Sequence, residues 1–321
     1  MKRHMQIQGL LRIAALAGLC ALAIPSHSAA PLKIVWPYPA GGDVDGVLRL
    51  MAEQWSADQG RPVLVDNKLG AAGLIAMQVV HTAPMDGNTL LAAPMGTMAL
   101  LPLVRKLPLN PLDAFVPVCQ FAETGGFVFT GKHLGFKNFN EFVTYARQNP
   151  GKLSYASSGI GTQVHVVAEM MQKKLNIKML HVPYKGPTES INDLIAGRVD
   201  VMFEPAAVPF AQSGKIDILA SLSDKMPPGM PPVPSGKEVG MDGLPAAWFG
   251  LFVRKGTASQ EVAALEKGCA QVVNHPNFMA RMKSYQARPT YRSGSDLMTI
   301  WQADFRSQAD VVRSLNLPQE N

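Results

Sequence analysis

Two glycine-rich turns contain the residue types in this chain that are suited to binding a small anion. The first turn, residues 37–42, reads PYPAGG, and the second, residues 157–162, reads SSGIGT. Each turn follows an apolar, strand-like run and precedes a helical pattern. Glycine lets the backbone approach a ligand closely, and the first amides of a helix are unpaired donors with partial positive charge. The pattern therefore predicts a cleft in which two helix N-termini face one carboxylate.

Either turn taken alone is equally well explained as a strand-to-helix connection with capping residues and no ligand. The two turns together favour the binding interpretation, because in open α/β sheets ligands bind beyond the carboxyl ends of the strands. In the second turn, Ser157, Ser158 and Thr162 add hydroxyl donors without a formal charge.

Four titratable side chains lie near the two turns in the sequence. Asp45 falls in the first turn of the expected helix, where we interpret it as a capping residue. Asp43 opposes a bound anion unless the ligand also carries an amine. Glu204, after the strand-like run 199–203, is either a contact from the second domain or a solvated loop carboxylate. We interpret His165 as a packed, hydrogen-bonding residue rather than a catalyst.

No catalytic signature accompanies these residues. The chain has no GxSxG or HExxH motif, and Val164 stands where a dinucleotide-binding fingerprint would need its third glycine. A secreted hydrolase that uses His165 with Asp43 or Asp45 is the less favoured alternative, and a ligand-binding sensor that signals through a membrane partner is another. We expect no enzymatic activity, no cofactor and no bound metal.

The composition indicates an exported protein with two domains. The chain has 321 residues, of which 47% are hydrophobic and 17% charged. Residues 1–29 have the basic start, apolar stretch and small-residue cleavage zone of a signal peptide. Their removal takes away Lys2, Arg3 and Arg12, so the formal net charge falls by three, from +6 to +3. The remaining basic residues are scattered, which argues against nucleic acid as a partner. We expect a periplasmic monomer.

Two of the three cysteines remain after the signal peptide. Cys119 lies in a strand-like run and Cys269 in a helical one, and two buried thiols are the favoured interpretation. An oxidising compartment permits a bridge between them, but a lone pair this far apart in the sequence has no framework signature.

Short apolar strands alternate with helices from residue 32 onward. The first set of elements is expected at residues 32–36, 47–59, 63–65, 74–82 and 89–93. The second set is expected at residues 127–129, 139–148, 153–156, 163–175, 179–182, 188–196, 199–203 and 218–220. This alternation predicts an α/β fold with mostly parallel sheets and helices on both faces.

The chain is expected to cross twice between two domains. Domain 1 is expected to comprise residues 30–124 and 252–321, and domain 2 residues 125–251, with hinge crossings near 120–126 and 248–252. The proline-rich stretch 226–234 is expected to form an extended surface loop.

Five segments, in this order, resemble the Bug family of extracytoplasmic solute receptors, which serve tripartite tricarboxylate transporters. They are WPYPAGG at 36–42, PMDGNTLL at 84–91, PGKLSYASSG at 150–159, HVPYKG at 181–186 and WFGLF at 248–252. The resemblance implies a type II periplasmic binding fold, in which two α/β domains close over a small carboxylate. It also implies that the captured ligand is presented to membrane subunits of a transporter.

The resemblance implies ligand contacts from both domains. The contacts in the first domain are Tyr38, Ala40, Gly41, Gly42 and Asp45, with Ala93, Met95 and Thr97 on the same rim. The contacts in the second domain are Ser157, Ser158, Gly159, Thr162 and His165. We add Asp43 and Glu204 as residues that set ligand choice. The chain departs from the family pattern at Met98, Leu101 and Glu204-Pro205, which leaves the ligand open between an organic acid and an amino acid.

Overall fold

The computed structural model describes residues 30–184, 186–222, 231–241, 244, 247–282 and 287–314, without the side chain of Asp43. The expected signal peptide lies outside the described residues, as does most of the expected proline-rich loop. Among the described residues, no helix has the length and apolar character needed to cross a bilayer. Two sheets and the helices packed on them make up this part of the chain.

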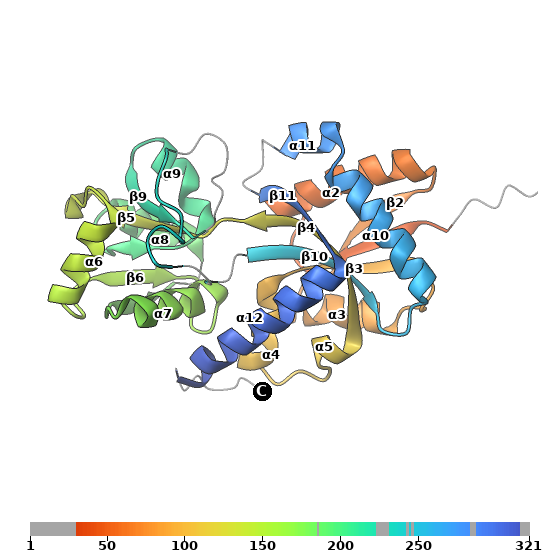
Figure 1. The fold of residues 1–321 in the computed structure, drawn as a ribbon, viewed down its shortest axis with the longest axis horizontal. Helices are drawn as coiled ribbons and strands as arrows, with labels where there is room; N and C mark the ends of the chain where they lie inside the picture. The colour runs from red at the N-terminus through yellow and green to blue at the C-terminus, as the bar shows by residue number, and fades with distance from the viewer. Residues whose placement is uncertain are drawn as a thin grey trace, which may run out of the picture. The chain divides into compact units, whose positions relative to one another are not determined.

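The first sheet has six strands in the order β11-β4-β10-β3-β1-β2 (Figure 1). Parallel pairing joins β1 to β2 and β3, whereas β10 runs antiparallel to β3 and β4, and β11 runs antiparallel to β4. The strands are β1 (Leu32–Trp36), β2 (Val63–Asn67), β3 (Thr89–Pro94), β4 (Phe115–Thr124), β10 (Ala247–Arg254) and β11 (Ala287–Ser293). The helices of this part are α2 (Asp43–Gln59), η2 (Ala71–Gly73), α3 (Leu74–Thr82), η3 (Gly96–Leu100), α4 (Leu101–Val104), α5 (Pro111–Ala114), α10 (Ser259–Val273), α11 (Pro276–Met282) and α12 (Gly294–Ser314).

The apolar core around the six-stranded sheet has two layers, one on each face, and the side chains of β1 alternate between them. Leu32 and Ile34 belong to a cluster with Trp55 of α2 and residues of α10 and α11. Val35 belongs to a second cluster, formed with α3 and α12 and including Trp301. Because successive strand residues point to opposite faces of a sheet, one short apolar strand contributes to both layers. The sheet is therefore covered by helices on both faces.

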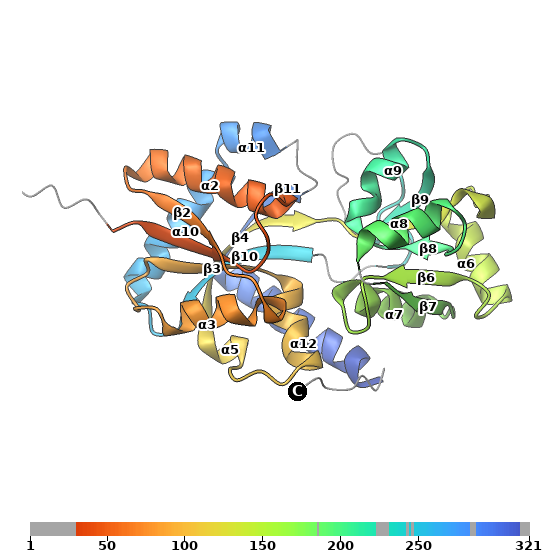
Figure 2. The same ribbon diagram turned by 180° about the vertical axis from the view of Figure 1, so that it is seen from behind.

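The second sheet has five strands in the order β7-β6-β8-β5-β9 (Figure 2). The strands are β5 (Phe127–Gly131), β6 (Ser154–Ser157), β7 (Leu180–Pro183), β8 (Val201–Met202) and β9 (Ile216–Ser221). The helices of this part are η4 (Lys132–Leu134), α6 (Phe139–Gln148), α7 (Gln163–Leu175), α8 (Pro187–Ile195), η5 (Pro205–Ala207) and α9 (Val208–Gln212). Two apolar clusters, one with α6 and α7 and the other with α8 and α9, cover its two faces.

The α/β fold class is confirmed, but the prediction of mostly parallel sheets is wrong. Both sheets are mixed, because antiparallel strands occur where the chain passes between them. β4 leads to β5 through Gly125 and Gly126, and β5 runs antiparallel to both of its neighbours. A strand that enters a sheet in this way is not preceded by the helical crossover that parallel pairing requires.

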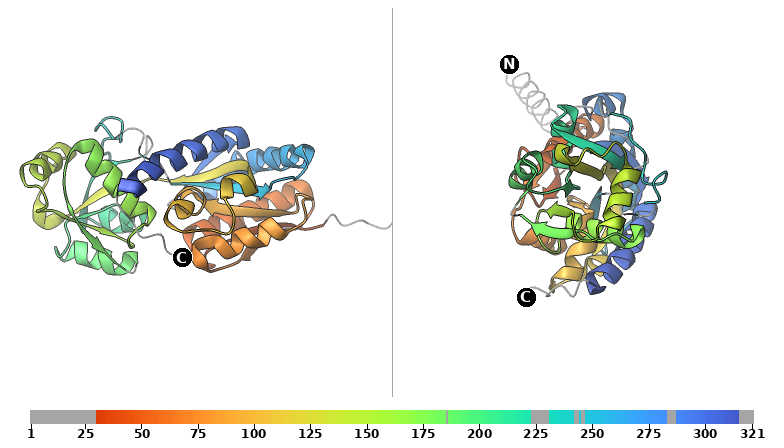
Figure 3. Two further views of the ribbon diagram at one scale, coloured as in Figure 1. Left: turned by 90° about the horizontal axis from the view of Figure 1, so that it is seen from below. Right: turned by 90° about the vertical axis from the view of Figure 1, so that its left-hand side faces the viewer.

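The domain boundaries at residues 124 and 252 stay a prediction. β10 pairs with β4 from Ala247 onward, so residues 247–251 lie in the six-stranded sheet although they were expected in domain 2. A small apolar cluster joins the two parts, since Val311 and Val312 of α12 pack with Val166 of α7. In Figure 3, α12 is the long dark blue helix, the colour of residues near the C-terminus.

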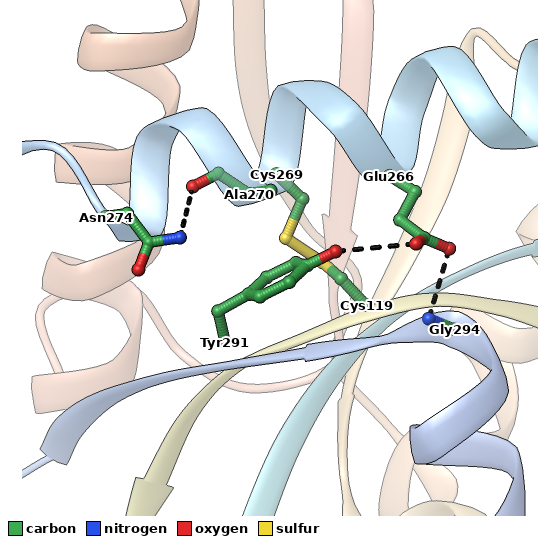
Figure 4. Close-up of a disulfide and its surroundings, with 7 residues drawn as sticks. All are labelled: Cys119, Glu266, Cys269, Ala270, Asn274, Tyr291 and Gly294. Atoms are coloured by element: carbon green, nitrogen blue, oxygen red, sulfur yellow. Dashed lines mark hydrogen bonds between the residues drawn. A yellow bond between two sulfur atoms is a disulfide. The ribbon is translucent and has the colours of Figure 1, made fainter.

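A disulfide bridge links Cys119 of β4 to Cys269 of α10, so the interpretation of two free buried thiols is wrong (Figure 4). The two Cα atoms are 6.6 Å apart, although 150 residues separate the cysteines in the sequence. Both side chains are fully buried in the core layer between β4 and α10. Close by, Glu266 accepts hydrogen bonds from the Tyr291 hydroxyl and from the Gly294 amide.

We expect the double variant Cys119→Ala/Cys269→Ala to lower the free energy of unfolding by about 2–5 kcal/mol, because the bridge restricts the unfolded chain over a long loop. Urea denaturation of oxidised protein, followed by circular dichroism, measures the change. As a control, a reductant should bring the wild-type protein to a similar midpoint. Equal midpoints for oxidised wild type and variant would contradict this contribution to stability.

Candidate functional site

The first glycine turn is fixed by a buried carboxylate. Asp45, only 2% exposed, accepts hydrogen bonds from the Gly41 amide at 3.0 Å, from Arg49 Nε at 2.8 Å and from Asn67 Nδ2 at 2.8 Å. Burial opposes its ionisation, but these hydrogen bonds outweigh burial and lower the pKa of Asp45. Because the Gly41 amide donates to Asp45, it is already used within the turn. The amides that follow, from Gly42 onward, belong to the open N-terminus of α2.

Tyr38 and Thr97, two of the predicted contacts, are hydrogen-bonded to each other. The Tyr38 hydroxyl lies 3.1 Å from Thr97 Oγ1, and Thr97 in turn donates to the carbonyl of Ala72. Ala71 and Ala72 have φ values of 46° and 53°, in the left-handed region that residues with a Cβ rarely adopt. Such backbone strain is common at binding sites.

The predicted contacts of the first domain differ in their exposure to solvent. Ala93 and Met95 are fully buried in the core layer with α3 and α12. Ala40, Gly41 and Gly42 are exposed, and the side chain of Asp43 lies outside the described part of the structure. The open turn and Tyr38 therefore form the accessible portion of this predicted set.

The second glycine turn is built around positive φ angles at Gly159 and Gly161, of 124° and 75°. The Thr162 hydroxyl donates to the Gly159 carbonyl at 2.8 Å and caps α7. Ser157 Oγ accepts from the Gly159 amide, and the Gly161 amide donates to Nδ1 of His165 at 3.0 Å. Four of the predicted second-domain residues thus hold one turn in shape.

The two turns share one hydrogen-bonding pattern. In each, a glycine amide donates to the side chain four residues later: Gly41 to Asp45, and Gly161 to His165. The acceptor is a carboxylate balanced by Arg49 in the first turn and an imidazole in the second. Both acceptors lie in the first turn of the following helix. α2 has no side-chain cap, whereas in α7 the Thr162 hydroxyl accepts a hydrogen bond from the His165 amide.

His165 stacks on His181, which the sequence did not single out as a site residue. The two ring centroids are 4.1 Å apart with planes 9° from parallel, and the Tyr155 ring lies 4.8 Å from His181 and 6.5 Å from His165, near parallel to both. Burial lowers the pKa of His165, and burial together with His165 lowers the pKa of His181 to about 4. Both imidazoles are therefore neutral at pH 7, and the hydrogen bond from Gly161 places the proton of His165 on Nε2.

Ser157 Oγ lies 2.6 Å from Nε2 of His181, a contact that superficially resembles a nucleophile and its base. Ser157 is fully buried, so no substrate reaches its hydroxyl. A histidine whose pKa is about 4 is also a weak base at neutral pH. This pair therefore supports the turn and does not form a hydrolytic centre.

Glu204 lies at the carboxyl end of β8, and its carboxylate accepts a hydrogen bond from the Ser158 hydroxyl. Burial raises the pKa of Glu204, and the bond from Ser158 partly offsets this effect. The side chain lines a pocket of about 170 Å³ whose walls also include Phe203, Leu222 and Phe249. Glu204 is thus a pocket residue rather than a freely solvated loop carboxylate.

The predicted site residues that the structure describes form several small hydrogen-bonded groups rather than one continuous hydrogen-bond network. Tyr38 joins Thr97, and Ser158 joins Glu204, but among the described residues no hydrogen bond connects the first turn to the second. Within the same part of the chain, no group of three His, Cys, Asp or Glu side chains could hold a metal ion.

Asn67 and His181 are residues of the candidate site that were not expected from the sequence. Asn67 ends β2, beside β1, and donates to both Asp45 and the carbonyl of Tyr38. His181 lies on β7, the parallel neighbour of β6. In both cases the available signal was a polar residue on the strand next to the one that leads into a glycine turn.

Two sheets with helices on both faces, and glycine turns at the carboxyl ends of parallel strands, form the arrangement in which open α/β proteins bind ligands. The family model of the tripartite tricarboxylate transporter family receptor matches residues 47–317. The chain belongs to this family, which confirms the resemblance noted in its sequence.

Individual relatives agree with this assignment. A UPF0065 protein from Pseudomonas sp. (strain P51) is 32% identical, over 81% of this chain and 78% of its own length. The structure of an R. palustris protein with adipate has a TM-score of 0.74 at 27% identity, covering 91% of this chain and 99% of that one. The periplasmic binding protein BugD has a TM-score of 0.69 at 28% identity, covering 90% and 99%. The matched family is a family of transporter receptors, and BugD is a periplasmic binding protein, so the chain is a solute-binding receptor rather than an enzyme.

We expect the free energy of unfolding to fall as the pH is lowered from 6.5 to about 4, partly because of His181. Its folded pKa, about 4, lies below the usual 6.5. Between these values the unfolded chain therefore binds a proton that the folded chain excludes, and stability present above pH 6.5 is lost. Urea unfolding of wild type and His181→Gln, at several pH values across this range, should show a shallower decline for the variant.

The matched control for this experiment is His275→Gln, because His275 lies between α10 and α11 and outside the stack. It should keep the wild-type decline. An identical decline in all three proteins would contradict the assignment of a depressed pKa to His181.

Proposed function

We propose that the chain captures a small carboxylate with its two glycine turns and delivers it to the membrane subunits of a tripartite transporter. The observation that carries the proposal is the pair of turns, each with a positive-φ glycine and each leading into a helix whose first two amides have no partner within the helix. Amides at a helix N-terminus bind anions without a formal counter-charge, which allows release as well as capture. The adipate named with the R. palustris relative is a ligand of this chemical class.

The two-lobed arrangement supports a receptor that closes on its ligand. In this proposal, domain 1 carries the first turn and domain 2 the second, and the strands that cross between the sheets act as the hinge. We further propose that residues 1–29 are removed on export, and that the mature protein is a periplasmic monomer. BugD, with which the chain shares its fold, is a periplasmic binding protein.

A matched pair of variants at Gly42 tests the first turn. Gly42 has a φ of −76°, which suits proline, and an added Cβ there meets nothing within 4 Å. Gly42→Pro removes one amide donor, whereas Gly42→Ala adds a methyl group and keeps the donor. Since a hydrogen bond to a charged group contributes roughly 1.5–3 kcal/mol, we expect Gly42→Pro to lose about tenfold or more in affinity. Gly42→Ala should bind like wild type.

The measurement is calorimetric titration with adipate, malate, citrate and glutamate, after a thermal-shift screen has ranked the four acids. Melting temperatures without ligand verify that both variants fold. The proposal is contradicted if none of the acids raises the melting temperature of the wild type. Equal affinity for Gly42→Pro and Gly42→Ala would remove the first turn from the site.

A further inference from the structure

The pocket that contains Glu204 lies where the chain passes between the two sheets. Its lining includes Gly125 and Gly126, from the connection between β4 and β5, and Ala247 at the start of β10. It also includes Gln163, the residue that follows the second glycine turn and begins α7. The pocket therefore adjoins the proposed anion site and continues from it toward the crossing strands.

Polar and apolar groups are unevenly divided in this pocket. Phe203, Leu222 and Phe249 provide apolar walls, and Glu204 is the only charged residue among the lining residues that the structure describes. The hydrogen-bond partner of its carboxylate in the same part of the chain is the uncharged Ser158 hydroxyl. A carboxylate in apolar surroundings is costly to ionise unless a cation or several donors pair with it.

The position of Ser158 links the two regions. Its hydroxyl contacts Glu204, and its backbone belongs to the turn that leads into the first amides of α7, of which Thr162 caps that of His165. A ligand whose carboxylate meets those amides therefore lies close to a carboxylate of the protein. A ligand with negative charge at both ends is repelled here, whereas a ligand with one carboxylate and one cationic group has a partner for each charge.

We infer that the pocket at Glu204 recognises a protonated amine, so that the ligand of this receptor is an amino acid rather than a plain dicarboxylate. The inference rests on the proposed function, because it assigns the second charged group of a ligand held by the glycine turns. Glu204 acts as the specificity-determining residue: it pairs with the ammonium group and disfavours acids that lack one. The apolar walls exclude water from this pair and so strengthen it.

Matched ligand pairs test the inference, because each pair differs only in the presence of an ammonium group. The pairs are L-glutamate with glutarate, and 5-aminopentanoate with pentanoate, which place the amine next to and far from the carboxylate. Calorimetry on the full mature chain should give at least tenfold tighter binding of the amine-bearing member in one pair. In Glu204→Gln the preference should fall below about threefold, while Glu204→Asp, which keeps the charge, should retain part of it.

The outcomes separate this inference from the proposed function. If plain acids bind and the amine gives no advantage in either pair, Glu204 does not select an amine and the receptor assignment stands. An amine preference that persists unchanged in Glu204→Gln also overturns the role of Glu204. If none of the acids in these pairs binds to the wild type but adipate, malate or citrate does, the inference fails and the proposed function stands. If none of these seven acids binds, both fail. Melting temperatures of the variants verify that they are folded.

Discussion

Each glycine turn must keep its shape while leaving backbone amides open to a ligand, and this constraint governs the residues around both turns. An open helix N-terminus would otherwise be closed by a capping side chain or by water. Here one glycine amide of each turn donates to a side chain four residues later, to Asp45 in one case and to His165 in the other. In the first turn this bond leaves α2 without a side-chain cap, whereas in the second turn the Gly159, Thr162 and His165 amides are also paired and the first two amides of α7 have no partner within the helix.

The choice of acceptor sets the electrostatics of each half of the site. Asp45 brings a negative charge, which Arg49 balances and to which the neutral Asn67 side chain donates a hydrogen bond. His165 brings no charge at neutral pH, because burial lowers its pKa. Its neutrality has a structural consequence, since a proton on Nδ1 would take away the acceptor of the Gly161 amide. The stack on His181 therefore supports the shape of the second turn through His165.

Local features of this fold could be predicted from the sequence, and contacts between distant segments could not. The helices expected at 74–82 and 163–175 coincide with α3 and α7, and the strand expected at 32–36 coincides with β1. In these segments the apolar period and the flanking glycines act within a few residues. The bridge from Cys119 to Cys269 depends instead on the packing of α10 against β4. The same holds for Asn67 and His181, which reach the turns from neighbouring strands.

The pocket at Glu204 connects recognition with the crossing between the sheets. Gly125 and Gly126 form the short link from β4 to β5, and a Cβ added to them would lie 2.9 Å from the ring of Phe127 and 2.7 Å from Leu222. A side chain in this link would require Phe127 or Leu222 to shift, and both glycines line the pocket. A group that enters the pocket contacts the segments through which the proposed domains would move. In the proposed receptor, the residue that selects the ligand and the link that permits closure thus meet in one place, so that a ligand of the wrong charge fails both to bind and to favour the closed state.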